Sequence, residues 1–268
     1  TIQDFLQQHT RLLRESGIET ARLDVLVLLE DTLGMERSSL LAHPDHVLTT
    51  AQLTELNKKI MQRAQHLPLA YIRGHAPFFG RDFVVNTYVL VPRPETESII
   101  ELLKNIRFTE PLRIADVGTG SGCIGVTAAL ELPGNAVDLY DTDQPALDVA
   151  RQNAARLGVK CAYYLGDLLE PYRHAYDVVL ANLPYVPDKY PVNQAAAFEP
   201  ALALFSGTDG LDHYRRLWQQ LAARQHKPAH VIIESLPEQH AALAKLAAAM
   251  GYQLHTALGY VQHFRLNG

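Results

Sequence analysis

The sequence has few cysteines and no excess of positive charge. Only two cysteines occur in 268 residues, Cys123 and Cys161, so it predicts neither a disulfide framework nor a zinc site. The twelve histidines show no metal-ligand spacing, and we expect no metal. The formal net charge is −5 with no long basic run, which provides no electrostatic footprint for a nucleic-acid backbone.

Long apolar runs are also missing. No stretch approaches the roughly 20 residues that a membrane-spanning helix needs. The first residues, TIQDFLQQHTRLLRESG, lack the charged and apolar regions of a signal peptide. Hydrophobic residues make up 47% and charged residues 20%, which is typical of a folded globular protein. We therefore expect a cytoplasmic protein without membrane contact and, by default, a monomer.

The pattern of apolar residues divides the chain into regions of different expected structure. Up to residue 66, apolar residues recur at helical spacing and predict a small helical domain, in which Thr49 and Gln52 resemble a capping box. Residues 67–92 contain short segments rich in aromatic and β-branched residues, YIRG, FFGRDFVV and YVLV, with glycines between them. This pattern predicts a β-hairpin linker between two domains.

From residue 93 to residue 268, strand-like segments alternate with helical ones. The expected strands are LRIADVG, AVDLYD, CAYYLGD, YDVVLANLP and HVIIES, with YQLHTA and VQHFRLN as the last two candidates. Parallel neighbours require crossover connections, which the intervening helices provide. The alternation predicts an α/β domain with a mainly parallel sheet covered by helices on both faces.

Three of these strands carry an acid at or near their ends, at the edge where such sheets bind ligands. The first is followed by DVGTGSG, with Asp116 ahead of glycines that let a ligand approach the backbone. The loop candidates are Gly118, Thr119, Gly120, Ser121 and Gly122. A tight strand-to-helix turn alone would also explain such a loop.

Asp141 ends the next strand, about 20 residues further on, where an acid can bind both hydroxyls of a ribose. Asp167 and Leu168 follow the third strand, placed to meet an adenine edge and face. The alternatives are a helix-capping aspartate and a loop acid. Three acids at successive strand ends together favour a nucleoside site.

The glycine spacing bears on which nucleoside cofactor binds. Dinucleotides favour G-x-G-x-x-G, whereas this loop reads G-x-G-x-G with Asp116 two residues ahead of it. A carboxylate suits a cationic cofactor, so the sequence favours S-adenosylmethionine, whose sulfonium carries an activated methyl group.

The fourth strand ends in Asn182, Leu183, Pro184 and Tyr185. The Asn182 side-chain oxygen and the Leu183 carbonyl can accept hydrogen bonds from a planar nitrogen substrate and stabilise the charge that grows on it. Pro184 stiffens the turn, and Tyr185 can stack on the substrate. The alternative is an Asn-x-Pro turn that closes a buried strand.

These motifs together resemble the PrmC/HemK release-factor glutamine methyltransferases, which are class I S-adenosylmethionine-dependent enzymes. The resemblance covers most of the chain. The combination of PRPETE with EPALAL is more specific to this family than the glycine loop is. The matching segments are PLAYIRGHAPFFGRDFVV at 68–85, VLVPRPETE at 89–97, ADVGTGSG at 115–122, GDLLEP at 166–171, NLPY at 182–185 and FEPALALFSGTDGLDHYRR at 198–216.

The resemblance implies a Rossmann-like fold and methylation of the glutamine in the Gly-Gly-Gln loop of class I peptide release factors. It implies that residues 118–122, Asp141, Leu168 and Asn182 contact the cofactor, that residues 182–185 hold the glutamine, and that the helical domain 1–66 grips the protein substrate. Arg93 and Glu95 would lie near the site. An alternative for that segment is a helix opened by Pro94, with acids at its positive end.

Two positions depart from the family pattern. Leu183 replaces the first proline of Asn-Pro-Pro-Tyr, and Leu236 replaces a glycine. We expect the first change to spare the chemistry while loosening the turn, and the second to bear on the geometry of the rim. The Asn-Leu-Pro-Tyr motif also occurs in rRNA adenine dimethyltransferases, so adenine N6 methylation of rRNA or DNA is the alternative activity. A cofactor-binding scaffold without catalysis is a third reading.

Overall fold

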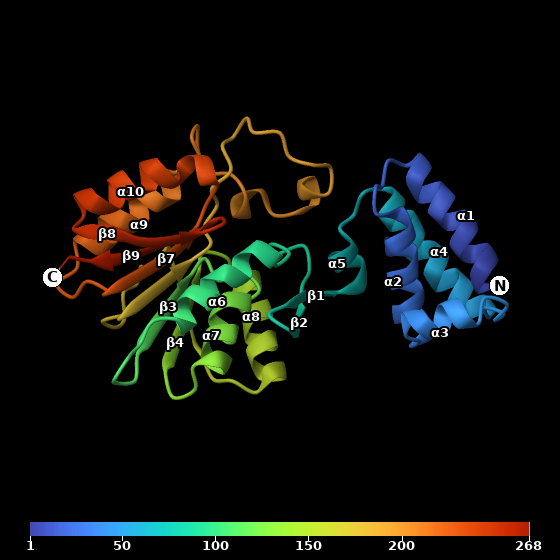
Figure 1. The fold of residues 1–268 in the computed structure, drawn as a ribbon, viewed down its shortest axis with the longest axis horizontal. Helices are drawn as coiled ribbons and strands as arrows, with labels where there is room; N and C mark the ends of the chain where they lie inside the picture. The colour runs from blue at the N-terminus through green and yellow to red at the C-terminus, as the bar shows by residue number, and fades with distance from the viewer. Residues whose placement is uncertain (268) are drawn as a thin grey trace. The chain divides into compact units, whose positions relative to one another are not determined.

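The computed structural model describes residues 1–267, which form two compact units (Figure 1). One unit comprises residues 1–74 with 193–198, and the other comprises residues 75–192 with 199–267. Each unit has its own hydrophobic core. The domain limits at residues 66 and 92 remain a prediction.

The first unit is helical. Its helices are α1 Ile2–Glu15, α2 Ala21–Leu33, α3 Arg37–Ala42, α4 Thr50–Ala64 and α5 Leu69–Arg73. The capping box expected ahead of α4 is present, because Thr49 Oγ1 accepts from the Gln52 amide and Gln52 Oε1 accepts from the Thr49 amide. The core contains Leu13, Leu28 and Leu40, none of them accessible to solvent, so the apolar spacing of the sequence is used for packing.

The second unit begins with a hairpin and contains the sheet. Strands β1 His75–Phe78 and β2 Arg81–Val84 pair antiparallel. The seven-stranded sheet has the order β5-β4-β3-β6-β7-β9-β8. Its strands are β3 Arg113–Val117, β4 Ala136–Asp141, β5 Ala162–Leu165, β6 Val178–Ala181, β7 His230–Glu234, β8 Tyr252–Leu258 and β9 Val261–Leu266. The first five are parallel, and the last two join as an antiparallel pair, which confirms the mainly parallel sheet.

Helices cover both faces of this sheet (Figure 1). One face carries α6 Glu97–Lys104, α7 Cys123–Glu131 and α8 Gln144–Leu157, and the other carries α9 Asp212–Ala222 and α10 His240–Ala249. Alternate strand residues serve the two cores: Ile114 packs with the first set of helices, and its neighbour Ala115 packs with the second. Short 3₁₀ turns complete the unit at η1 Pro94–Thr96, η3 Ala201–Ala203 and η4 Pro237–Gln239, while η2 Ala196–Phe198 belongs to the first unit.

The segment from 67 to 92 is only partly a hairpin. YIRG belongs to helix α5, which Gly74 ends in the left-handed conformation (φ 79°). YVLV, at 88–91, is irregular and forms no strand. FFGRDFVV supplies the turn and β2, as expected.

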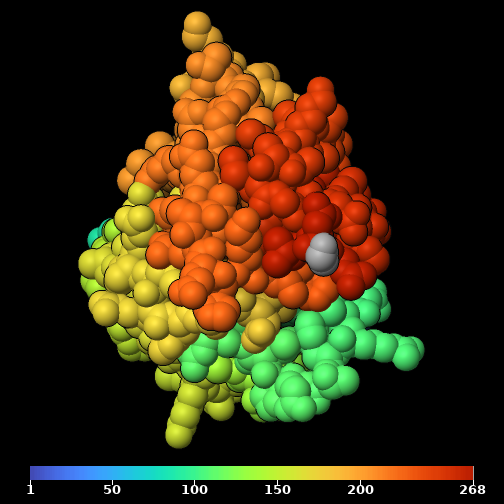
Figure 2. Space-filling model, turned by 90° about the vertical axis from the view of Figure 1, so that its left-hand side faces the viewer, coloured from blue at the N-terminus to red at the C-terminus, as the bar shows by residue number. Residues whose placement is uncertain are grey.

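Figure 2 views the second unit from the side of its C-terminal strands, where the orange and red segments from α9 onward form a continuous surface. No helix within residues 1–267 is both long and apolar enough to cross a bilayer.

Candidate active site

A cavity of about 350 Å³ lies at the carboxyl edge of the sheet, entirely within the second unit. Its volume falls in the range of small-molecule sites. Most of the site residues expected from the sequence line it: Arg93, Gly118, Thr119, Gly120, Ser121, Asp141, Asp167, Leu168, Asn182, Leu183 and Pro184. The cavity therefore brings together the ends of four neighbouring strands.

The glycine loop after β3 requires glycine at defined points. Gly118 has a φ of 70°, and a Cβ placed on it would lie 2.8 Å from Leu183 Cδ2. Gly122 has a φ of 80°, precedes α7 and would press a Cβ to 3.0 Å from the Ala150 Cβ. The backbone of this loop thus packs closely against its neighbours at two points where the positive φ also favours glycine.

Asp116 lies behind the loop. Its carboxylate is fully buried and does not line the cavity. Oδ2 accepts from Thr119 Oγ1 at 2.6 Å and from the Gly125 amide at 2.8 Å, while Oδ1 has no hydrogen-bond partner among residues 1–267. Burial raises the pKa of Asp116 to about 6. The structure therefore gives Asp116 the task of holding the loop, and its direct contact with a cofactor remains a prediction.

Asp141 and Asp167 both face the cavity. Asp141 Oδ2 accepts from the Gly120 amide at 2.8 Å and Oδ1 accepts from the Asp143 amide at 3.0 Å, so this acid ties the end of β4 to the glycine loop. Burial raises the pKa of Asp141, against these backbone hydrogen bonds. Asp167 forms an ion pair with Arg216.

Asn182 is oriented by a residue that the sequence did not single out. Its Nδ2 donates to Thr96 Oγ1 at 3.1 Å, and Thr96 is only 2% exposed. Because the amide nitrogen is engaged there, the side-chain oxygen is left to act as an acceptor. Thr96 itself lines the cavity.

Tyr185 does not line the cavity. Its hydroxyl donates to Glu234 Oε1 at 3.0 Å, and Glu234 at the end of β7 is 1% exposed. Burial raises the pKa of both groups, and the nearby Glu234 charge raises that of Tyr185 further. Hydrogen bonding from Thr96, Tyr185 and Asn182 lowers the pKa of Glu234 and partly offsets the effect of burial. The stacking of Tyr185 on a substrate remains a prediction.

The two departures from the family pattern fit their surroundings. Leu183 is 3% exposed beside Gly118, and its amide donates to the Tyr214 hydroxyl at 3.3 Å. Leu236 has φ −62° and ψ 140°, which any L-residue adopts. A leucine at position 236 therefore introduces no backbone strain.

Arg93 and Glu199 form an ion pair that links the PRPETE and EPALAL segments. Arg93 Nη2 lies 2.6 Å from Glu199 Oε2, and the Glu199 side chain is 2% exposed. Glu95 is exposed and lies outside the cavity, so its substrate contact remains a prediction. Pro94 opens a 3₁₀ turn that runs into α6, with acids in the first turn, as the alternative proposed.

The cavity fits the cofactor favoured by the sequence. The backbone of residues 118–121 lines the cavity, and Asp141 lies at the end of the neighbouring strand. Leu168 adds an apolar contact that is itself buried. Within the described residues, no cluster of three histidine, cysteine or acidic side chains is arranged to hold a metal ion.

Comparisons with known proteins agree with this geometry. Residues 4–74 match the family described as PrmC N-terminal domain, and residues 96–203 match the methyltransferase small domain. The chain is 38% identical to a release factor glutamine methyltransferase of Bacillus subtilis over 92% of its own length and 88% of the relative. It is 35% identical to the corresponding protein of Coxiella burnetii over 88% and 86%.

The fold also matches a solved methyltransferase from Pyrococcus furiosus. The TM-score is 0.51 at 16% identity, with 81% of this chain and 96% of that one covered. A likeness at this identity shows a methyltransferase fold and nothing finer.

Proposed function

The chain belongs to the release factor glutamine methyltransferase family, and from this premise we propose that it methylates the side-chain amide nitrogen (N5) of a glutamine in a release factor. The methyl donor is S-adenosylmethionine, and the target is the glutamine of the Gly-Gly-Gln motif in class I peptide chain release factors. The relatives support this substrate over the adenine alternative, since all those named here act on glutamine by name.

One observation carries the chemistry: the Asn182 amide faces the cavity with its nitrogen already bound to Thr96. S-adenosylmethionine, when bound, supplies an electrophilic methyl group. A glutamine amide nitrogen is a weak nucleophile because its lone pair is delocalised. Asn182 Oδ1 and the Leu183 carbonyl accept its two N–H groups, hold it in line and stabilise the positive charge that develops. The proton is then lost to water.

The remaining parts of the proposal concern the whole protein. The helical part of the first unit, which matches the PrmC N-terminal family over residues 4–74, is proposed to grip the release factor. Arg93 and Tyr185 are proposed to contact the glutamine or its neighbours. A monomeric state, a cytoplasmic location and the absence of nucleic-acid binding remain predictions.

Replacing Asn182 with alanine tests the proposal. We expect Asn182→Ala to lower kcat by about 100-fold or more, because a preorganised partner of the developing charge is lost. Calorimetry should show little change in cofactor affinity. Labelled methyl transfer is measured in parallel with purified class I release factor, rRNA and DNA.

The matched control is Asn105→Ala, at an exposed asparagine that follows α6 and lies outside the cavity. It should keep the wild-type rate. Equal rates for Asn182→Ala and wild type would reject the role of Asn182, and label on adenine instead of glutamine would reject the substrate.

A further inference from the structure

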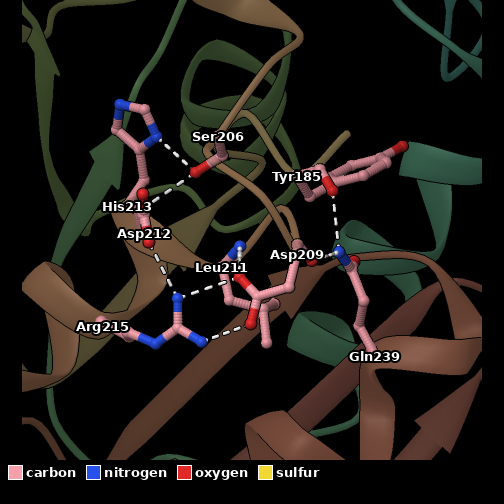
Figure 3. Close-up of polar contacts among 8 residues, drawn as sticks. All are labelled: Tyr185, Ser206, Asp209, Leu211, Asp212, His213, Arg215 and Gln239. Carbon is pink, nitrogen blue, oxygen red and sulfur yellow. Dashed lines mark hydrogen bonds and ion pairs between the residues drawn. The ribbon is translucent and has the colours of Figure 1, made fainter. Parts of the chain in front are cut away.

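Gln239 bonds to the backbone of the Asn182–Tyr185 turn, and both N–H donors of its side-chain amide are engaged (Figure 3). Its Nε2 donates to the Tyr185 carbonyl at 2.8 Å and to the Asp209 carbonyl at 2.8 Å. Its Oε1 accepts from the Leu236 amide at 3.0 Å. Gln239 is 7% exposed, so water does not substitute readily for these partners.

Gln239 also binds the 206–211 loop through the Asp209 carbonyl, and this loop approaches the Asn182–Tyr185 turn closely. Gly210 has a φ of 77°, and a Cβ added there would lie 2.0 Å from the Tyr185 carbonyl oxygen and 2.5 Å from Gln239 Nε2. Only glycine allows this approach, because the obstacle is backbone rather than the end of a flexible side chain. The two backbones are thus packed directly against each other.

This loop is anchored to helix α9. Arg215 pairs with both carboxylate oxygens of Asp209, and its Nη1 also lies 2.8 Å from Asp212 Oδ1 (Figure 3). Ser206 Oγ lies 2.6 Å from His213 Nδ1 and accepts from the His213 amide at 3.1 Å. The Asp209 carbonyl that Gln239 binds therefore belongs to a segment fixed at two points.

Tyr185 is hydrogen-bonded at both its backbone carbonyl and its side-chain hydroxyl. Gln239 binds its carbonyl, and Glu234 binds its hydroxyl. Both come from β7 or the turn that follows it. The amide of Leu183 is bound through Tyr214, whose hydroxyl donates to the Glu234 carbonyl.

We propose that Gln239 is a positioning residue for methyl transfer: it clips the Asn182–Tyr185 turn to the 206–211 loop and so fixes the acceptors that the substrate amide meets. The inference rests on the proposed function. Gln239 does not line the cavity, so it acts through the turn and not on the substrate.

The test is Gln239→Glu, which keeps size and shape but replaces the two donors by an acceptor facing two carbonyls. We expect kcat to fall about 10- to 100-fold, as a small displacement of reacting groups can cause, with unchanged S-adenosylmethionine affinity. The deficit should shrink as pH is lowered, because a protonated glutamate can donate to one of the carbonyls again. The control is Glu238→Gln, at the exposed neighbour in the same turn.

Gln239→Met provides a second variant if the glutamate variant does not fold. It removes all three hydrogen bonds without adding charge, and the same loss of kcat is expected. Wild-type kcat in a folded Gln239→Glu or Gln239→Met protein would overturn the inference. A loss of cofactor affinity as large as the loss of kcat would overturn it too, because it would show general collapse of the site.

Hydrogen exchange separates this inference from the proposed function. The amides of residues 183, 185 and 186 should exchange faster in Gln239→Glu than in Glu238→Gln, whichever substrate the enzyme methylates. Wild-type protein that methylates no release factor would refute the proposed function and leave this measurement standing. Equal exchange in the two variants would refute the clip.

Discussion

At the residue scale, the direction of one amide decides whether Asn182 can accept a hydrogen bond from a substrate. Thr96 Oγ1 accepts from the amide nitrogen, which leaves the oxygen to accept a hydrogen bond from a substrate. We expect Thr96→Val, which keeps the shape and removes the hydroxyl, to lower kcat roughly fivefold, in line with about 1 kcal/mol for one hydrogen bond. Steady-state methylation of release factor measures this.

Thr96→Ser is the matched control because it retains the hydroxyl. It should keep most of the wild-type kcat, and both variants should bind S-adenosylmethionine as tightly as wild type. If the serine and valine variants lost activity equally, packing by the Thr96 methyl group and not its hydroxyl would be responsible.

Some site residues could be predicted from the sequence and others could not, depending on whether a local pattern places them at the site. Asp141 and Asn182 could, since each ends a strand and strand ends share one edge of a parallel sheet. Thr96 could not, because its bond to Asn182 spans 86 positions along the chain and leaves no local pattern. Glu234 meets Tyr185 across 49 positions, for the same reason. The position of Asp116 ahead of the glycine loop could be predicted from the motif. The direction of its carboxylate, toward a ligand or toward the loop, could not, because it depends on packing.

At the element scale, one ion pair joins the segment ahead of α6 to the segment around η3. Arg93 and Glu199 lie 106 positions apart, and both segments contribute residues to the cavity wall. Burial raises the pKa of Glu199, and the Arg93 charge partly offsets this. Without Arg93, the buried carboxylate would have no charged partner.

We expect Arg93→Met to destabilise the protein more than the double variant Arg93→Met with Glu199→Gln, because the single change leaves an uncompensated buried charge. The two changes should show a coupling of about 0.5–3 kcal/mol in thermal unfolding. In the single variant the folded-state pKa of Glu199 rises further above its unfolded value. The loss of stability caused by the unpaired Glu199 carboxylate is therefore complete above its folded-state pKa. This loss disappears as the pH falls toward the pKa of Glu199 in the unfolded state. Equal penalties across this pH range would contradict the pairing.

The prediction of elements succeeded where periodicity continued over a whole element. The strands from β3 to β9 were all anticipated: β3 to β7 are short, mostly apolar segments, whereas β8 and β9 mix polar and apolar residues. YVLV has the composition of a strand, yet Val89 and Val91 line the cavity and Tyr88 is 56% exposed. YIRG forms the end of a five-residue helix, too short to show a helical period. Short apolar segments do not distinguish sheet pairing from packing at a cavity.

At the scale of the whole molecule, the two compact units have separate cores. Leu28 lies in the core of the first unit, whereas every residue that lines the cavity belongs to the second. A ligand that binds only the folded second unit should stabilise that unit alone. We therefore expect two transitions in calorimetry and a cofactor effect on one of them.

At 100 times its dissociation constant, S-adenosylmethionine adds about 2.7 kcal/mol of stability, which should raise the second unit's transition by roughly 5–10 °C. The variant Leu28→Ala assigns the transitions, because removing a fully buried side chain costs about 2–5 kcal/mol and should lower only the transition of the first unit. Asp141→Ala should reduce the cofactor shift without altering the first transition, since Asp141 lies at the cavity. A single transition that responds to both the cofactor and Leu28→Ala would show that the two cores unfold as one, and the separate roles proposed for the units would need revision.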